Sequence, residues 1–176
     1  MTKDRKKDID LAAIKILVLD VDGVMTDGGL IIHADGSESK VFNILDGHGI
    51  RMWRRAGMKV AFLSGRSSAP TVHRAVQLEV DYVLEDCFNK VESLDKLLAQ
   101  TSLSLVNVAY VGDDLMDLPV IRRVGFGAAV ANAVDEVRKC ADYVTSRPGG
   151  SGAVREVIEY ILKDAGKWDQ VVERYI

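Results

Sequence analysis

The chain has 176 residues, 48% of them hydrophobic, and a formal net charge of −3, which is typical of a globular protein with its own core. The mildly acidic balance argues against nucleic acid as the main partner, and no apolar stretch is long enough for a membrane span or a signal peptide. Cys87 and Cys140 lack metal-ligand spacing and suit a reducing compartment, so we expect a cytoplasmic protein.

After a polar N-terminal arm over residues 1–12, strand-like and helix-like segments alternate. Short apolar runs bounded by turn residues predict strands over 14–21, 59–63, 82–84 and 108–111, with further short elements near Ala128 and Tyr143. Apolar residues three and four apart predict helices over 50–56, 70–78, 91–98, 118–124 and 154–162. The turn residues at 34–37 predict a hairpin between strands over 30–32 and 40–42.

This order predicts an α/β fold with a doubly wound, Rossmann-like parallel sheet, helices on both faces and a β-hairpin inserted after the first strand. We expect a single domain over residues 1–176, with a C-terminal tail over 164–176. The intervals after the first strand and between residues 65 and 89 are already filled by these elements, so neither holds a separate cap domain.

Acidic side chains follow two of the predicted strands at the point where each strand ends. Asp20 and Asp22 close the first strand, and Asp113 and Asp114 close the strand over 108–111. Because ligands of such sheets bind outside the carboxyl ends of the strands, we expect these acids to converge on one crevice. A hard divalent cation would relieve their repulsion, and oxygen-only ligands suit Mg²⁺.

Phosphoryl transfer is a reaction that such a crevice can perform. One carboxylate can attack phosphorus and form an aspartyl-phosphate, while a second protonates the leaving alcohol and then deprotonates water. Ser64, which follows the strand over 59–63, and Lys90, at the start of a helix, would hold the other phosphoryl oxygens. Asp117 has two interpretations, as the N-cap of the helix over 118–124 or as the partner that orients Lys90.

Four motifs resemble, in order, those of the haloacid dehalogenase-like phosphatases: Asp20-Val21-Asp22-Gly23, Ser64, Lys90 and Gly112-Asp113-Asp114-Leu115-Met116-Asp117. Residues 20–28, 42–50, 108–114 and 149–156 are similar to one branch, the phosphatases of 3-deoxy-D-manno-octulosonate 8-phosphate, and the resemblance spans nearly the whole chain after the arm. It implies a phosphoric monoester hydrolase that releases the free sugar acid and phosphate in lipopolysaccharide precursor synthesis.

The resemblance also implies roles for individual residues. Asp20 is implied as the nucleophile and Asp22 as the acid/base. The implied Mg²⁺ ligands are Asp20, Asp113 and the backbone carbonyl of Asp22, with Asp114 and Asp117 behind them. Ser64 and Lys90 are implied to bind the phosphoryl group. The remaining implied substrate contacts are Asn43, Asp46, Gly47, Arg51, Arg66 and Arg74.

Two features qualify this assignment of the substrate. Arginines suit the carboxylate of a sugar acid, although Arg74 on its own is also compatible with a surface arginine. Ser64 stands where relatives more often have threonine, which keeps the hydroxyl, and Glu85-Asp86 stands where they often have Gln-Gly. These departures bear on the identity of the substrate rather than on the reaction.

Other functions remain open beside this one. A phosphatase of a nine-carbon keto acid phosphate related to sialic acid has similar motifs, but such relatives tend to have glutamate at the position of Arg66. A signalling receiver domain pairs its acids adjacently on the first strand, unlike Asp20 and Asp22. A non-catalytic assembly module would have no need of the intact acids.

The expected partners are a small sugar acid phosphate and further copies of the chain, with neither nucleic acid nor membrane. The resembling branch is homotetrameric, and the predicted hairpin has unpaired strand edges that invite pairing with another subunit. We therefore expect a homotetramer in which residues 149–155 lie near the site of the adjacent chain. The tail beyond Lys163 is expected to be mobile or to close over the substrate.

Overall fold

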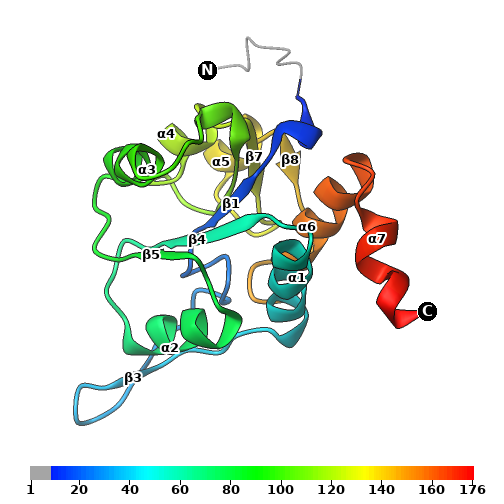
Figure 1. Cartoon of the computed structure of the whole chain (residues 1–176). Helices are drawn as coiled ribbons and strands as arrows, with labels where there is room; N and C mark the ends of the chain where they lie inside the picture. Colours follow the sequence, from blue (N-terminus) through cyan, green and yellow to red (C-terminus); the bar gives the residue numbers. More distant parts are fainter. Residues whose placement is uncertain (1–8) are drawn as a thin grey trace.

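A six-stranded parallel sheet forms the centre of the computed structural model, which describes residues 9–176 (Figure 1). Its strand order is β5-β4-β1-β6-β7-β8. The strands are β1 (Ile16–Leu19), β4 (Lys59–Leu63), β5 (Tyr82–Leu84), β6 (Val108–Gly112), β7 (Phe126–Ala129) and β8 (Tyr143–Val144). The predicted α/β class and the doubly wound parallel sheet are therefore confirmed.

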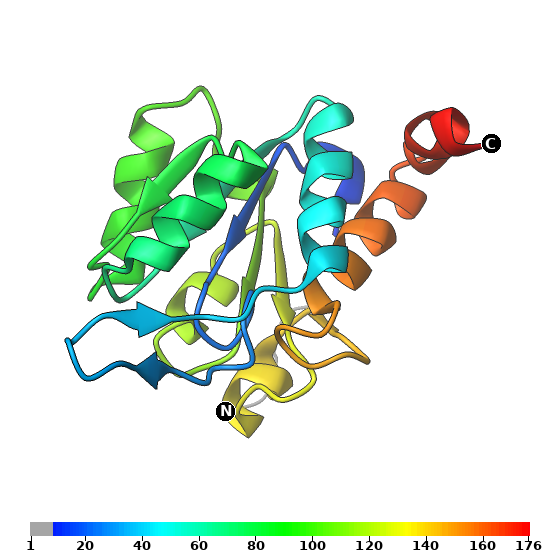
Figure 2. The same ribbon diagram turned by 90° about the horizontal axis from the view of Figure 1, so that it is seen from below.

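Helices cover both faces of the sheet. One face carries α1 (Ile44–Arg55), which packs against α2 (Ala69–Leu78) and α6 (Ala153–Asp164). The other carries α3 (Lys90–Ala99), α4 (Leu118–Ile121) and α5 (Asp135–Cys140), which contact one another in that order. Figures 1 and 2 both show α1 and α6 side by side. The remaining helical segments are η1 (Leu11–Ala13), η2 (Leu105–Asn107), η3 (Glu173–Tyr175) and α7 (Trp168–Val172).

Strand β1 is central because all four of its residues are apolar and fully buried between β4 and β6. The chain runs from β1 through β4 to β5 on one side, and then returns to β6 on the other side of β1. Strand order therefore reverses between β1 and β6, which is where sheets of this kind bind their ligands. Asp20 follows β1 directly, so the sequence places its first acid at this reversal point.

Several predicted boundaries were wrong. Helix α1 begins at Ile44, six residues before the predicted start, because the Asn43 side chain accepts hydrogen bonds from the amides of Leu45 and Asp46. The hairpin pairs β2 (Ile31–Ile32) with β3 (Glu38–Ser39), so its second strand ends before the predicted 40–42. Helix α4 ends at Ile121 rather than 124, and α5 was not predicted, since six residues carry too little periodicity.

The two ends of the chain also differ from expectation. Residues 1–8 of the predicted arm lie outside the described residues, but the arm does not extend to residue 12, because Leu11 is buried in the core. The tail forms α7 with Val171 buried, and the Lys163 ammonium lies 4.6 Å from the centre of the Trp168 ring. The Tyr175 hydroxyl lies 2.9 Å from Nε2 of His48 on α1. The described tail thus packs on α1 and α6 of its own chain rather than over the acidic edge.

Among residues 9–176, no helix combines the length and the apolar character that crossing a bilayer requires.

Candidate active site

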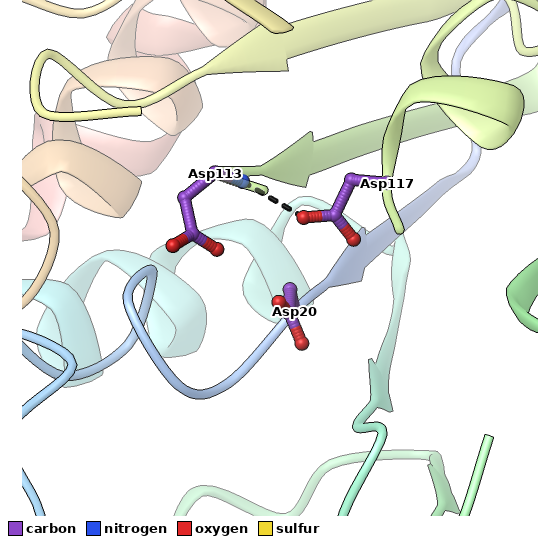
Figure 3. Close-up of side chains that lie close together, drawn as sticks. All are labelled: Asp20, Asp113 and Asp117. Atoms are coloured by element: carbon purple, nitrogen blue, oxygen red, sulfur yellow. Dashed lines mark hydrogen bonds between the residues drawn. The ribbon is translucent and has the colours of Figure 1, made fainter. Parts of the chain in front are cut away.

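Three carboxylates meet where β1 and β6 end (Figure 3). Asp20 follows β1, Asp113 follows β6, and Asp117 directly precedes α4. One oxygen from each lies within 4.8 Å of the others, close enough to hold a metal ion together. The convergence of Asp20 and Asp113 was predicted from the strand ends, and the register of the parallel sheet produces it, since Leu19 pairs with Val111.

Lys90 brings a buried positive charge to this group. Its Nζ lies 2.9 Å from Oδ2 of Asp20 and 2.5 Å from Oδ1 of Asp117. Burial alone would lower the pKa of this ammonium, but the two carboxylates outweigh burial and the pKa of Lys90 is raised. Lys90 is therefore a permanent cation, and two of its three N–H donors are used within the site.

Asp117 is the structural centre of the site. Its Oδ1 accepts hydrogen bonds from Lys90 and, at 2.6 Å, from the Tyr110 hydroxyl. Its Oδ2 accepts from the amides of Asp113 at 2.8 Å and Asp114 at 3.1 Å, and its side chain makes no cap bond to α4. The geometry thus favours the orienting role over the N-cap. Because both oxygens are saturated, we regard Asp117 as support for a metal site rather than as a ligand.

Tyr110 was missed by the sequence analysis, although β6 contains a usable signal. A tyrosine inside a fully buried strand needs a partner for its hydroxyl, and the nearby acids are the available acceptors. Burial is also the main cause of the strongly raised pKa of Tyr110, so the hydroxyl remains a donor to Asp117.

Lys90 alone does not balance the three carboxylates of the site. Burial raises the pKa of both Asp20 and Asp113, and repulsion from the neighbouring carboxylates raises it further. Oδ1 of Asp113 is buried and has no hydrogen-bond partner among the described residues. The backbone of Gly23 packs so closely on this carboxylate that a Cβ at position 23 would lie 2.1 Å from Oδ2 of Asp113. An oriented, unpartnered carboxylate oxygen is the arrangement that a hard cation needs.

Asp22 and Ser64 reach the same edge of the sheet from two loops. The Asp22 carboxylate is partly exposed and is paired with Lys40, a residue that the sequence analysis missed. Ser64 is buried after β4, where its Oγ donates to the carbonyl of Arg66 at 2.9 Å. Asp114 is exposed, and its Oδ1 accepts only a local hydrogen bond from the amide of Leu115.

Most of the expected substrate contacts near α1 have structural roles within the chain. Asp46 is fully buried, and its oxygens accept from the amides of Gly152 at 3.2 Å and Arg155 at 2.8 Å, at the start of α6. Gly47 packs against Arg74, since a Cβ there would lie 2.4 Å from Nη2 of Arg74 and would displace the guanidinium. The described contacts of Asp46 thus lie within the chain, at the start of α6, while Asn43 donates to the Gly150 carbonyl.

The three expected arginines make their contacts around α1, α2 and the hairpin. Arg66 is half exposed, and its Nη2 lies 2.9 Å from Oε2 of Glu38 on the hairpin. Arg51 and Arg74 lie between α1 and α2, where Arg51 donates to the Gln77 carbonyl and Arg74 to the carbonyl of Asn43. Arg51 and Arg74 thus donate to neutral acceptors, and Arg66 is paired with a single carboxylate.

Two sequence features that bear on specificity have local explanations. Glu85 accepts from the amide of Ser68 at 2.7 Å, and Asp86 accepts from the amide of Ser67 at 3.1 Å, so both acids order the loop before α2. The glycine-rich segment packs on the chain's own first loop, since a Cβ on Gly149 would lie 1.7 Å from the Gly23 carbonyl oxygen. Close backbone packing therefore explains these glycines without a neighbouring chain.

Comparisons with known proteins agree with this geometry. Residues 78–158 match the haloacid dehalogenase-like hydrolase family. The chain is 41% identical over 157 residues to 3-deoxy-D-manno-octulosonate 8-phosphate phosphatase KdsC of Escherichia coli K12, covering 89% of this chain and 84% of that protein. A crystal structure of the Moraxella catarrhalis phosphatase with magnesium, phosphate and KDO is similar, with a TM-score of 0.92, 37% identity and coverage of 94% and 95%. A probable YrbI family phosphatase of Pseudomonas syringae pv. phaseolicola has a TM-score of 0.92, 48% identity and coverage of 94% of each chain.

Proposed function

We propose that this chain, which belongs to the 3-deoxy-D-manno-octulosonate 8-phosphate phosphatases within the haloacid dehalogenase-like hydrolases, hydrolyses that sugar phosphate to the free sugar acid and phosphate. The observation that carries the proposal is the cluster of Asp20, Asp113 and Asp117 beside Lys90, at the point where strand order reverses between β1 and β6. The similarity of the chain to these enzymes adds to it.

In the proposed reaction, Asp20 acts as the nucleophile. A carboxylate oxygen of Asp20 attacks phosphorus, the bond from phosphorus to the sugar oxygen breaks, and Asp22 donates a proton to that oxygen. Water then attacks the aspartyl-phosphate, Asp22 takes the proton from the water, and phosphate leaves with Asp20 restored. Ser64 and the free N–H of Lys90 bind the oxygens of the transferring group.

The residues present also fit a Mg²⁺ ion. Asp20, Asp113 and the backbone carbonyl of Asp22 would hold it, and the unpartnered Oδ1 of Asp113 supports this assignment. Bound there, the ion would neutralise charge between the carboxylates and a phosphate oxygen.

Magnesium is expected to stabilise the protein more at pH 8 than at pH 5.5. Burial raises the pKa of Asp20 to about 6 and that of Asp113 to about 8, so without a cation their ionisation removes stability as pH rises from about 4 to about 8. Mg²⁺ binds the ionised carboxylates and so opposes this loss. At a concentration of 100 times its dissociation constant, it adds about 2.7 kcal/mol to the free energy of unfolding. Thermal unfolding with MgCl₂ or with EDTA at both pH values measures the difference. The Asp113→Asn variant should lose the response, and an equal response at both pH values would contradict the assignment.

A substrate panel tests the function itself. We expect kcat/KM to be highest for 3-deoxy-D-manno-octulosonate 8-phosphate, lower for a nine-carbon keto acid phosphate and lowest for hexose phosphates. The position of Arg66 at the border of the site favours the eight-carbon substrate over the nine-carbon alternative. A preference for the nine-carbon compound would replace the proposed substrate, and no Mg²⁺-dependent turnover on any phosphate would support a non-catalytic assembly module.

We further propose that residues 1–176 act as one catalytic domain, in the cytoplasm, as a homotetramer. The two cysteines, Cys87 and Cys140, are free thiols, which suits a reducing compartment. The hairpin forms its own two-stranded sheet outside the main sheet. Eight apolar side chains are exposed on the hairpin, the start of α1 and α2: Leu30, Ile31, Ile32, Val41, Ile44, Leu45, Val72 and Val76. An apolar surface of this kind supports association between chains.

Light scattering is expected to give a mass near four times 19.3 kDa. Replacing the highly exposed Ile44 by aspartate should shift the mass towards smaller species, because a charge would have to be buried in the interface. The matched change at the exposed Val106, which lies on η2 away from the hairpin, should leave the mass unchanged. A monomeric wild-type protein with full activity would contradict the proposed assembly.

A further inference from the structure

Lys40 is a buried lysine that belongs to none of the recognised motifs. Its side chain is 0% exposed, although it directly follows a hairpin that is largely open to solvent. Its Nζ lies 2.7 Å from Oδ1 and 3.0 Å from Oδ2 of Asp22, and it donates to Oγ1 of Thr71 at 3.3 Å. An ammonium has three N–H donors, and these three acceptors satisfy them, which is what a buried lysine requires.

Strand geometry explains how the hairpin delivers this charge. Side chains two residues apart on an extended chain point to the same face, so Glu38 and Lys40 face the same way. Glu38 accepts from Nη2 of Arg66 at 2.9 Å and from the hydroxyl of Ser68. Glu38 and Lys40 therefore join the hairpin to the loops that follow β4 and β1. The hairpin itself lies across the carboxyl edge of the sheet (Figure 2).

The Asp22 carboxylate relies on its contact with Lys40, whereas the Asp20 carboxylate has more than one partner. Asp20 is held by Lys90 and by the amide of Val21. For Asp22, the hydrogen bonds given by the described part of the chain come from Lys40 alone, and its side chain is 30% exposed. Without that ammonium, the carboxylate would be free to take other side-chain torsions.

We propose that Lys40 is a positioning residue for the phosphatase reaction, one that holds the Asp22 carboxylate towards the oxygen of the leaving alcohol and couples this orientation to the attached hairpin. The inference rests on the proposed function, in which Asp22 is the acid/base. Proton transfer needs donor and acceptor within hydrogen-bond distance, and a misplacement of about 1 Å costs on the order of 100-fold in rate.

The test compares two substrates that differ in their need for a proton. The leaving alkoxide of a sugar phosphate needs protonation, whereas p-nitrophenolate leaves without it. We expect Lys40→Met to lower kcat/KM for the sugar phosphate by about 100-fold and to affect p-nitrophenyl phosphate much less. Lys40→Arg, which keeps a cation, should recover part of the loss. In an Asp22→Asn background, Lys40→Met should cause no further loss, because both changes remove the same function.

Lys59→Met is the matched control. Lys59 also forms a lysine–aspartate pair, with Nζ 2.8 Å from Oδ1 of Asp81, but it begins β4 at the opposite end of the sheet. This variant should keep wild-type kinetics, and light scattering checks that Lys40→Met keeps the wild-type mass. Equal losses on both substrates, or losses that add to those of Asp22→Asn, would overturn the inference. If the sugar phosphate is not a substrate, the proposed function fails, while any other alkyl phosphate that is hydrolysed still tests Lys40.

Discussion

Replacing Asp20 with asparagine is expected to lower kcat by at least about 10⁴-fold, the scale seen when a nucleophilic group is removed. The amide is not an anionic nucleophile and is a poor ligand for a hard cation, so both functions proposed for Asp20 are lost. The fold should persist, because the amide has almost the same shape and its oxygen can still accept from the amide of Val21. Steady-state kinetics and circular dichroism of the same preparation measure the two effects.

Asp27→Asn is the control for this prediction. Asp27 lies in the same loop, but it is exposed and its Oδ1 accepts from the amide of Gly29 at 2.8 Å, as in an ordinary turn. Its variant should keep wild-type turnover. Near wild-type activity in purified Asp20→Asn protein would instead show that the nucleophile has been assigned to the wrong residue.

Asp117→Ala is expected to reduce stability as well as activity. Four hydrogen bonds end at this carboxylate, and its removal leaves the Tyr110 hydroxyl and the amides of Asp113 and Asp114 without their acceptor. Removing one partner of a buried charge pair costs about 3–5 kcal/mol. For a chain of this size, such a loss lowers the unfolding temperature on the order of 10 °C. Denaturant titration and thermal unfolding both report it.

Asp95→Ala provides the comparison on the surface. Asp95 also pairs with a cation, since its Oδ1 lies 3.2 Å from Nη2 of Arg123, but both side chains are substantially exposed. Exposed pairs contribute about 0–1 kcal/mol, so this variant should unfold close to the wild-type temperature. Similar unfolding temperatures for the two alanine variants would mean that the Asp117 network has little influence on stability.

The parts of the fold that were predicted correctly are those with strong periodicity. The stripe of apolar residues on α6 and the apolar runs of β1, β4 and β6 each determine an element without help from the rest of the chain. The start of α1 depends instead on a side-chain cap at Asn43 and on packing that overrides Gly47 and Gly49. Such tertiary effects leave little trace in a local pattern.

The residues of the site also fall into those that a local pattern predicts and those that depend on distant segments. Strand ends predict that Asp20 and Asp113 converge, because a parallel sheet brings its carboxyl ends together. Sequence spacing does not show that Asp46 points inwards to α6, or that Lys40 points inwards to Asp22, because these contacts join segments distant in the chain. A buried charge becomes recognisable only when its neighbours are known.

The position of Asp46 also has a consequence for how the helices of this face are joined. Its carboxylate, carried by α1, accepts from backbone amides in the first turn of α6, and burial holds the pKa of this carboxyl above its usual range. Separating the two helices would expose these amides and the carboxylate, so α1 and α6 are expected to move together. The hairpin, in contrast, is joined to the loops after β1 and β4 by the side chains of Glu38 and Lys40. We therefore expect any shift of the hairpin relative to the sheet to leave the pair of α1 and α6 in place.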